Sequence, residues 1–297
     1  MDGYLLMDAS LRRLGQLPML QIPSMSIWHR ATAPVALVML ASCGASQTAS
    51  GPARQAEAEY DMAREVFYRG DWRVSLDHAR RSVVLDPQNA KALYFVSVVH
   101  AAFCLGDEGL SAPDCKIGEA EAFARRSVEA DAKLKDAKNL LGQILILRGQ
   151  YKEAMTVLKP LTEDPSYIAS HLAWGNYGWA QVQLGDLDGA IHSLTQAVVQ
   201  PKFCVGYFRL GVAYAKKSDL AHADQSFTRA LDVDSPDCKA MQQAWQSRGE
   251  VREKAQDLRG ALSDFKRCTD LGAKTPSGTA CSARAVGLRA RVTTEAS

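Results

Sequence analysis

Residues 174–201, WGNYGWAQVQLGDLDGAIHSLTQAVVQP, decide the fold of this chain. Apolar and small residues recur at helical spacing on both sides of Gly185-Asp186, which is typical of two amphipathic helices joined by a tight turn. Gly178 and Ala190 lie twelve positions apart, so each helix carries a small residue where the two helices would cross. Pro201 ends the second helix. The stretch therefore predicts a helix-turn-helix unit.

The same spacing recurs on both sides of this stretch. Gly70-Asp71 and Gly149-Gln150 supply further turns of the same kind. One helix pair cannot bury its apolar face alone, so neighbouring pairs must stack to form a continuous core. The sequence therefore predicts an all-α array of about six units. The pairs of small residues at this spacing are Ala63/Ser75, Gly142/Ala154, Gly178/Ala190, Gly211/Ala223 and Gly249/Ala261.

The second unit departs from the period. Ser97 has no small partner near position 109, and the pattern resumes only at Ala120. About eleven extra residues, 106–116, therefore enlarge the turn between the two helices of this unit. Cys104 and Cys115 flank the enlarged turn.

The unit at 174–201 resembles the tetratricopeptide repeat (TPR), whose pattern is W-x2-L-G-x2-Y…A-x3-F…A…P. The resemblance covers residues 56–269 and implies a right-handed α-solenoid of six units. Because the exposed end of a solenoid needs a cap, we expect residues 270–292 to form a loop and a capping helix, followed by a disordered tail at 293–297. The matching residues are Trp174, Tyr177, Gly178, Ala190, Leu194, Ala197 and Pro201.

The N-terminal segment has the features of a secretory signal. A short positively charged stretch that starts at Met25 precedes the apolar run Ala31–Leu40. This run is about ten residues long, whereas a membrane-spanning helix needs roughly 20. Leu40-Ala41-Ser42-Cys43 resembles the lipobox of bacterial lipoproteins, in which the cysteine is lipidated and becomes the new N-terminus. We therefore expect a signal region at 1–43, with Met25 as the true start, and a flexible tether at 44–55.

An ordinary signal peptide, in which Cys43 is accidental, is the alternative interpretation of this segment. No second apolar stretch reaches spanning length, so we expect the protein to be held at a membrane by lipid rather than embedded in it. The formal net charge is +2 and 47% of the residues are hydrophobic, which is enough to bury a core. So small a net charge gives no sign of the concentrated basic face that nucleic-acid binding needs.

Six further cysteines follow Cys43. An even-numbered set in an exported protein is typical of disulfides, and the stacking of units restricts the possible pairings. The alternative is a metal site that uses His100 and Cys104, which are four apart on one helical face. The expected pairs are Cys104–Cys115 across the enlarged turn, Cys204–Cys238 between the starts of units five and six, and Cys268–Cys281 at the capping helix.

The TPR resemblance also implies a binding surface, because positions 2, 5, 9 and 12 of each first helix line the concave side of a TPR solenoid. In units two to five these positions are largely apolar and aromatic, whereas unit six has Glu250 and Glu253 there. We therefore predict a partner-binding groove for an amphipathic helix or an extended peptide. The alternative is a tightly wound solenoid whose own centre these side chains fill. The predicted groove residues are Tyr94, Val98, Asn139, Ile146, Leu172, Trp179, Val182, Val205, Phe208 and Val212.

Catalytic chemistry has little support in the sequence. No HExxH, GxSxG, P-loop or paired-carboxylate motif is present. We expect a non-enzymatic protein with no cofactor, no metal and no small-molecule substrate. The histidines are scattered at His29, His78, His100, His171, His192 and His222, and we expect the last of these and His192 on solvated helix faces.

A lipobox, six TPR units and paired cysteines together resemble the type IV pilus secretin-assembly lipoproteins, the PilF/PilW/Tgl group. Residues 170–215 resemble the myxobacterial Tgl type most. The resemblance implies a scaffold on the periplasmic face of the outer membrane that binds a secretin subunit, and Gly44 after the lipidated cysteine is consistent with outer-membrane sorting. Two alternatives are a general TPR lipoprotein that recruits cell-wall enzymes or barrel-assembly components, and a hydrolase or redox protein whose site the sequence does not reveal.

Overall fold

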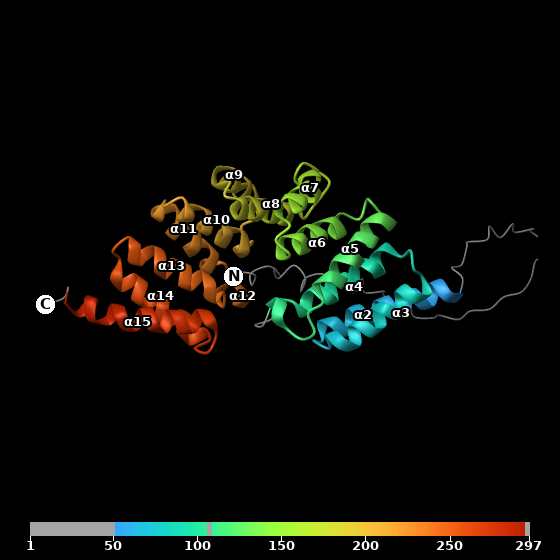
Figure 1. Ribbon diagram of the computed structural model, residues 1–297, viewed down its shortest axis with the longest axis horizontal. Helices are drawn as coiled ribbons and strands as arrows, with labels where there is room; N and C mark the ends of the chain where they lie inside the picture. The colour runs from blue at the N-terminus through green and yellow to red at the C-terminus, as the bar shows by residue number, and fades with distance from the viewer. Residues whose placement is uncertain (1–50, 106–108, 295–297) are drawn as a thin grey trace, which may run out of the picture.

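The chain folds into an elongated array of helices (Figure 1). The computed structural model describes residues 51–105 and 109–294, and all regular secondary structure in these residues is helical. None of the helices described is both long and apolar enough to cross a membrane. The predicted all-α class is confirmed.

Twelve of the helices form six helix-turn-helix units that follow one another along the array (Figure 1). The short helix α12 (Pro236–Lys239) lies between units five and six, and α15 (Pro276–Thr294) packs on unit six at the C-terminal end. The units are α2 (Gly51–Tyr68) with α3 (Trp72–Leu85), α4 (Ala90–Phe103) with α5 (Ile117–Ala130), α6 (Lys135–Leu147) with α7 (Tyr151–Thr162), α8 (Ser170–Leu184) with α9 (Leu187–Ala197), α10 (Cys204–Lys216) with α11 (Leu220–Asp232), and α13 (Gln242–Lys254) with α14 (Leu258–Leu271).

The paired small residues lie where the two helices of a unit cross, as the spacing predicted. In unit three a Cβ added to Gly142 would lie 2.5 Å from Leu158. In unit one the Ser75 hydroxyl donates a hydrogen bond of 2.8 Å to the Ala63 carbonyl oxygen on the opposite helix. These contacts require the two helix backbones to approach closely. The same steric relationship joins Gly178 to Leu194, Gly211 to Phe227, and Gly249 to Phe265.

The turns within the units reverse the chain through the left-handed backbone region. Gly70, Gly149 and Gly185 have φ values of +92°, +75° and +82°, a conformation that glycine adopts without a steric penalty. In units five and six the corresponding residues are Ser218 and Gln256, at φ +63° and +65°. The turn therefore does not require glycine in every unit, which is why the glycine signal fades toward the C-terminus.

The enlarged turn of unit two lies between α4 and α5, as predicted from the broken period. It contains a short 3₁₀ helix, Gly109–Ser111. The Arg73 guanidinium on α3 donates a hydrogen bond of 2.6 Å to the Asp114 carboxylate, which ties this turn to unit one.

Two predicted boundaries were wrong. The flexible tether was placed at 44–55, but α2 already begins at Gly51. Proline is tolerated in the first turn of a helix, so Pro52 does not delay the start, and the Ala, Arg and Gln residues that follow favour helix. At the other end α15 continues to Thr294, into the predicted tail at 293–297. The signal region, Cys43 and the rest of the tether lie outside the described residues.

Candidate partner-binding surface

The ten residues predicted to line an open groove lie inside the solenoid instead. Trp179 is 8% exposed and Phe208 only 4% exposed. Val98, Asn139, Ile146, Val182 and Val205 are buried too, while Tyr94, Leu172 and Val212 are partly buried, so none of the ten is exposed.

The predicted open apolar groove was therefore wrong, and the alternative of a filled centre describes the structure. The physical reason is the direct packing of successive first helices, α6 on α8 and α8 on α10. The Phe203 ring lies so close to α8 that a Cβ added to Gly175 would come within 2.7 Å of it. Because large rings fill the space between units, no open channel is left for a peptide along these positions.

A buried polar chain crosses three units at this centre. The Asn176 amide nitrogen on α8 donates a hydrogen bond of 3.2 Å to the Asn139 side-chain oxygen on α6. The Arg209 guanidinium on α10 in turn donates one of 3.0 Å to the Asn176 oxygen. Arg209 is 2% exposed, and its guanidinium lies 5.8 Å from the centre of the Trp179 ring. Buried polar groups that satisfy one another fix the register of packed elements, so this chain sets how units three to five stack.

Of the residues in and beside this polar chain, the sequence predicted Asn139 and Trp179 but not Asn176 or Arg209. An arginine among the apolar residues of 204–216 was the available signal, because a buried arginine must find hydrogen-bond acceptors and aromatic faces.

The acidic end of the concave side is neutralised by the capping helix. Arg284 of α15 donates a hydrogen bond of 2.8 Å to Glu253 and lies 3.7 Å from Glu250. Arg291 adds a hydrogen bond of 3.3 Å to Glu253. The two glutamates therefore hold α15 against α13 rather than forming an open acidic surface.

Unit six also contains a buried ion pair. Asp264 on α14 is 1% exposed and accepts two hydrogen bonds from Arg248 on α13, at 2.9 and 2.7 Å. Arg252 donates a third bond of 3.0 Å to the same carboxylate and one of 2.6 Å to Asp224 on α11. Units five and six are thereby joined by charge as well as by apolar packing.

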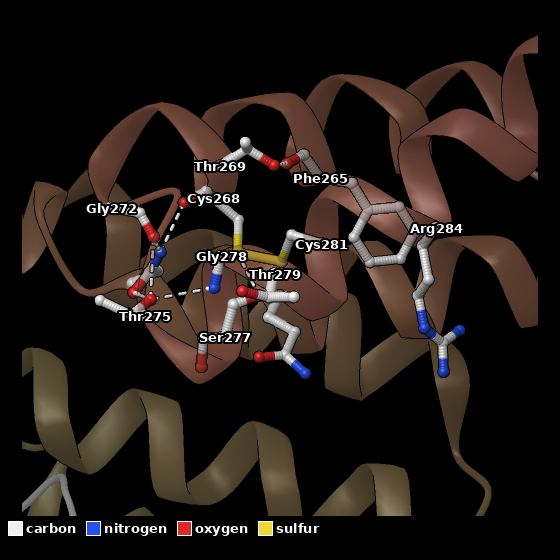
Figure 2. Close-up of a disulfide and its surroundings, with 12 residues drawn as sticks. Phe265, Cys268, Thr269, Gly272, Thr275, Ser277, Gly278, Thr279, Cys281 and Arg284 are labelled. Carbon is white, nitrogen blue, oxygen red and sulfur yellow. Dashed lines mark hydrogen bonds between the residues drawn. A yellow bond between two sulfur atoms is a disulfide. The ribbon is translucent and has the colours of Figure 1, made fainter.

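The six cysteines form the three disulfides argued from the sequence: Cys104–Cys115, Cys204–Cys238 and Cys268–Cys281. Figure 2 shows the last of these between α14 and α15, beside Phe265 and Arg284. Gln242 on α13 donates hydrogen bonds to the carbonyl oxygens of Cys268 and Gly272, at 2.7 and 3.0 Å. The loop into the capping helix is therefore fixed on both sides. Cys104 is bonded to Cys115, so the alternative metal pair with His100 is not formed.

The histidines are dispersed over the solenoid. His192 and His222 are exposed on second helices, as expected. His78 Nδ1 lies within hydrogen-bonding distance, 2.6 Å, of a Glu59 carboxylate oxygen, and His29 lies outside the described residues. His100 is 1% exposed and stacks on Phe123. Across 51–105 and 109–294, no group of three or more His, Cys, Asp or Glu side chains is arranged to hold a metal ion.

Burial and, to a lesser extent, the neighbouring Arg80 guanidinium together lower the pKa of His100 to about 4. The Arg80 guanidinium lies 3.3 Å from Nε2 of the His100 ring. Since arginine can only donate, Nε2 accepts and the neutral ring carries its proton on Nδ1. This histidine is a neutral core residue at pH 7.

The outer face of unit one carries a cleft of about 350 Å³ that the sequence did not predict. Ala58, Met62 and Leu85 form its apolar lining, and Glu59 and His78 lie at its polar side. Met62 is 44% exposed. No unit precedes α2 among the described residues, so no neighbouring helix covers the apolar side chains on its outer face. The place of α2 at the start of the array was the sequence feature that could have predicted this cleft.

Apolar side chains are also exposed near the connections between units. Ile168, between α7 and α8, is 99% exposed, and Val199, between α9 and α10, is 75% exposed. The two connections are neighbours, because His171 and Phe203, which follow them, have ring centres 5.4 Å apart. We call Ile168 and Val199 the loop edge. Exposed apolar side chains that gather on one surface are typical of protein contacts.

A family model described as tetratricopeptide repeat matches residues 171–198 and 206–237, which fall in units four and five. No protein of curated function matches the sequence. Among solved structures the chain is similar to PilW, described as a widely conserved type IV pilus biogenesis factor, at 16% identity and a TM-score of 0.63, over 76% of this chain and 97% of that chain.

Two further solved structures have the same architecture. PilF of Pseudomonas aeruginosa is 15% identical with a TM-score of 0.61, over 79% of this chain and 99% of that chain. A chain of the APC/C hetero-tetramer Cut9–Hcn1 is 12% identical with a TM-score of 0.66, over 78% of this chain and 43% of that one. Identities this low establish a shared fold. The chain is thus an α-solenoid with tetratricopeptide repeats in units four and five, and it shares its fold with PilW, PilF and a chain of the Cut9–Hcn1 assembly.

Proposed function

We propose that this chain is a lipid-anchored, non-enzymatic scaffold on the periplasmic face of the outer membrane, where it binds a secretin subunit and promotes secretin assembly for type IV pilus biogenesis. The observation that carries the proposal is the similarity to PilW and PilF over 97% and 99% of their lengths. The lipobox at Leu40–Cys43 and the Tgl-like stretch at 170–215 support it independently.

The proposed anchor restricts where the solenoid can lie. Cys43 precedes the first residue of α2, Gly51, by eight positions. An extended chain spans at most about 3.5 Å per residue, so the lipid would lie within roughly 28 Å of unit one. Figure 1 places α15 at the other end of the array from α2 and α3. In this arrangement unit one faces the membrane and the capping helix is directed into the periplasm.

The contact with a secretin subunit is assigned to outer surfaces, since the centre of the solenoid is filled. The loop edge supplies exposed apolar side chains at the middle of the array. Ile168 and Val199 are the residues on which we expect the apolar part of the contact to depend.

Affinity capture from solubilised outer membranes tests the proposal. The wild-type chain should retain the secretin subunit, and an Ile168→Glu/Val199→Glu variant should retain much less of it. Thr156→Glu/Thr195→Glu is the matched control, because both threonines are exposed on second helices of the same units. Recovery of a cell-wall enzyme or a barrel-assembly component in place of the secretin would favour the general-scaffold alternative.

A further inference from the structure

The net charge of the chain is small, but the charged residues are distributed unevenly along the solenoid. Residues 242–294, which contain α13–α15, have ten Lys and Arg against five Asp and Glu, a net charge of +5. Residues 51–241 have 22 Lys and Arg against 25 Asp and Glu, a net charge of −3. We call residues 242–294 the basic end.

Most acidic groups of the basic end are already engaged within it. Asp264 is shared by Arg248 and Arg252. Glu253 is shared by Arg284 and Arg291. Their charges are therefore unavailable to neutralise the remaining cations.

Five cations remain exposed and make no hydrogen bond or ion pair with any residue that the structure describes. They are Lys254, Arg259, Lys266, Arg267 and Lys274.

The geometry of α14 places three of these cations, Arg259, Lys266 and Arg267, on one surface. Arg259 and Lys266 are seven positions apart and share a helix face, and Arg267 lies beside Lys266. Lys274 follows in the loop to α15. At about 1.5 Å per residue the row is roughly 20 Å long. Asp270 is the acidic residue on the same exposed face, near its end.

The helix α14, on which most of this row of cations lies, is held firmly in place. The Cys268–Cys281 disulfide joins α14 to α15, and Phe265 is fully buried beneath the exposed face of α14. Rigid placement matters because charges held in place lose less entropy when a partner binds.

We propose that the basic end binds an acidic segment of a protein partner. Charge complementarity carries the inference, because unpaired cations in a row attract an acidic chain and orient it. The basic end lies away from the proposed anchor next to α2, so headgroups of the anchoring membrane are the less favoured occupant. This inference rests on the proposed function and deepens it: the acidic segment would belong to the secretin subunit.

The test uses the purified full mature chain and the purified secretin subunit. Arg259→Glu/Lys266→Glu/Arg267→Glu should weaken binding at least 10-fold at about 50 mM salt, and the difference should shrink at about 500 mM salt as screening increases. Lys91→Glu/Lys133→Glu/Lys152→Glu changes the charge equally at exposed lysines of units two and three and should alter the Kd less than threefold. An equal loss in both variants, or wild-type binding by the first, would overturn the inference.

A second probe separates failure of this inference from failure of the proposed function. A fluorescent decaglutamate peptide should bind the wild-type chain and the unit-two and unit-three variant but not the α14 variant, whether or not the secretin subunit binds. Absence of peptide binding to the wild type would overturn the inference. Phosphatidylglycerol vesicles that bind through the same three residues, while the peptide does not, would overturn it in favour of a lipid surface.

Discussion

Gly178 on α8 packs so closely against Leu194 on α9 that an added Cβ would lie 2.7 Å from the leucine Cγ. Gly118 on α5, by contrast, has no heavy atom within 4 Å of the same position. One helix crossing thus tolerates no methyl group, while another helical glycine has open space.

The two glycines give a matched pair of substitutions with opposite expected effects. Gly178→Ala should lower the free energy of unfolding by about 1–3 kcal/mol, because overpacking forces neighbouring side chains to move. Gly118→Ala should leave it unchanged or raise it by up to about 1 kcal/mol, since alanine loses less backbone entropy on folding. Urea denaturation followed by circular dichroism measures both. Equal stabilities would contradict the close helix crossing.

Trp179→Ala is expected to act through stability. The indole is buried in the main apolar core and contacts Arg209, so its removal should cost about 3–5 kcal/mol. Ile168→Ala should change stability by no more than about 0.5 kcal/mol, because Ile168 is 99% exposed. Thermal unfolding compares the two. A Trp179→Ala chain as stable as wild type would contradict the burial of Trp179 and would favour an open groove instead.

His100 should make the protein less stable in acid. Its pKa is about 4 in the folded chain and about 6.5 in an unfolded one. As pH falls from about 6.5 to 4, the unfolded state takes up a proton that the folded state does not, so stability decreases over this range. The contribution is on the order of 3 kcal/mol by pH 4. His100→Gln should reduce the difference between the free energies of unfolding at pH 7 and pH 4.5. An unchanged pH dependence would show that His100 does not cause the loss of stability in acid.

The Cys268–Cys281 disulfide should stabilise the capping helix. Replacing both cysteines by serine should cost about 2–4 kcal/mol, and amide exchange should accelerate first in α15, which rests mainly on α14. Peptide mapping under non-reducing conditions should recover this pair and the other two from the purified protein. Free thiols at these positions would contradict the pairing.

The repeat, the turns and the enlarged second unit could be predicted because each depends on local spacing. Gly185, for example, marks its turn by the backbone conformation that glycine permits. The disulfide pairs followed once the order of the units was known, since Cys204 and Cys238 precede neighbouring first helices.

The closed centre could not be predicted in the same way. Whether Trp179 faces solvent depends on how tightly successive units wind, and that angle results from many contacts between units. The link from Arg209 to Asn176, and the position of Phe203 against Gly175, join different units and have no signature in the repeat period. The early start of α2 has no clear signal because Pro52, which is typical of a linker, is equally compatible with the first turn of a helix.

The level of heat-resistant secretin multimers in outer membranes tests the central claim most directly. Cells that lack this chain should contain secretin monomers and few multimers, and the wild-type chain should restore the multimers. Cys43→Ser should fail to restore them because it removes the proposed lipid anchor. Wild-type multimer levels in cells without the chain would contradict the account.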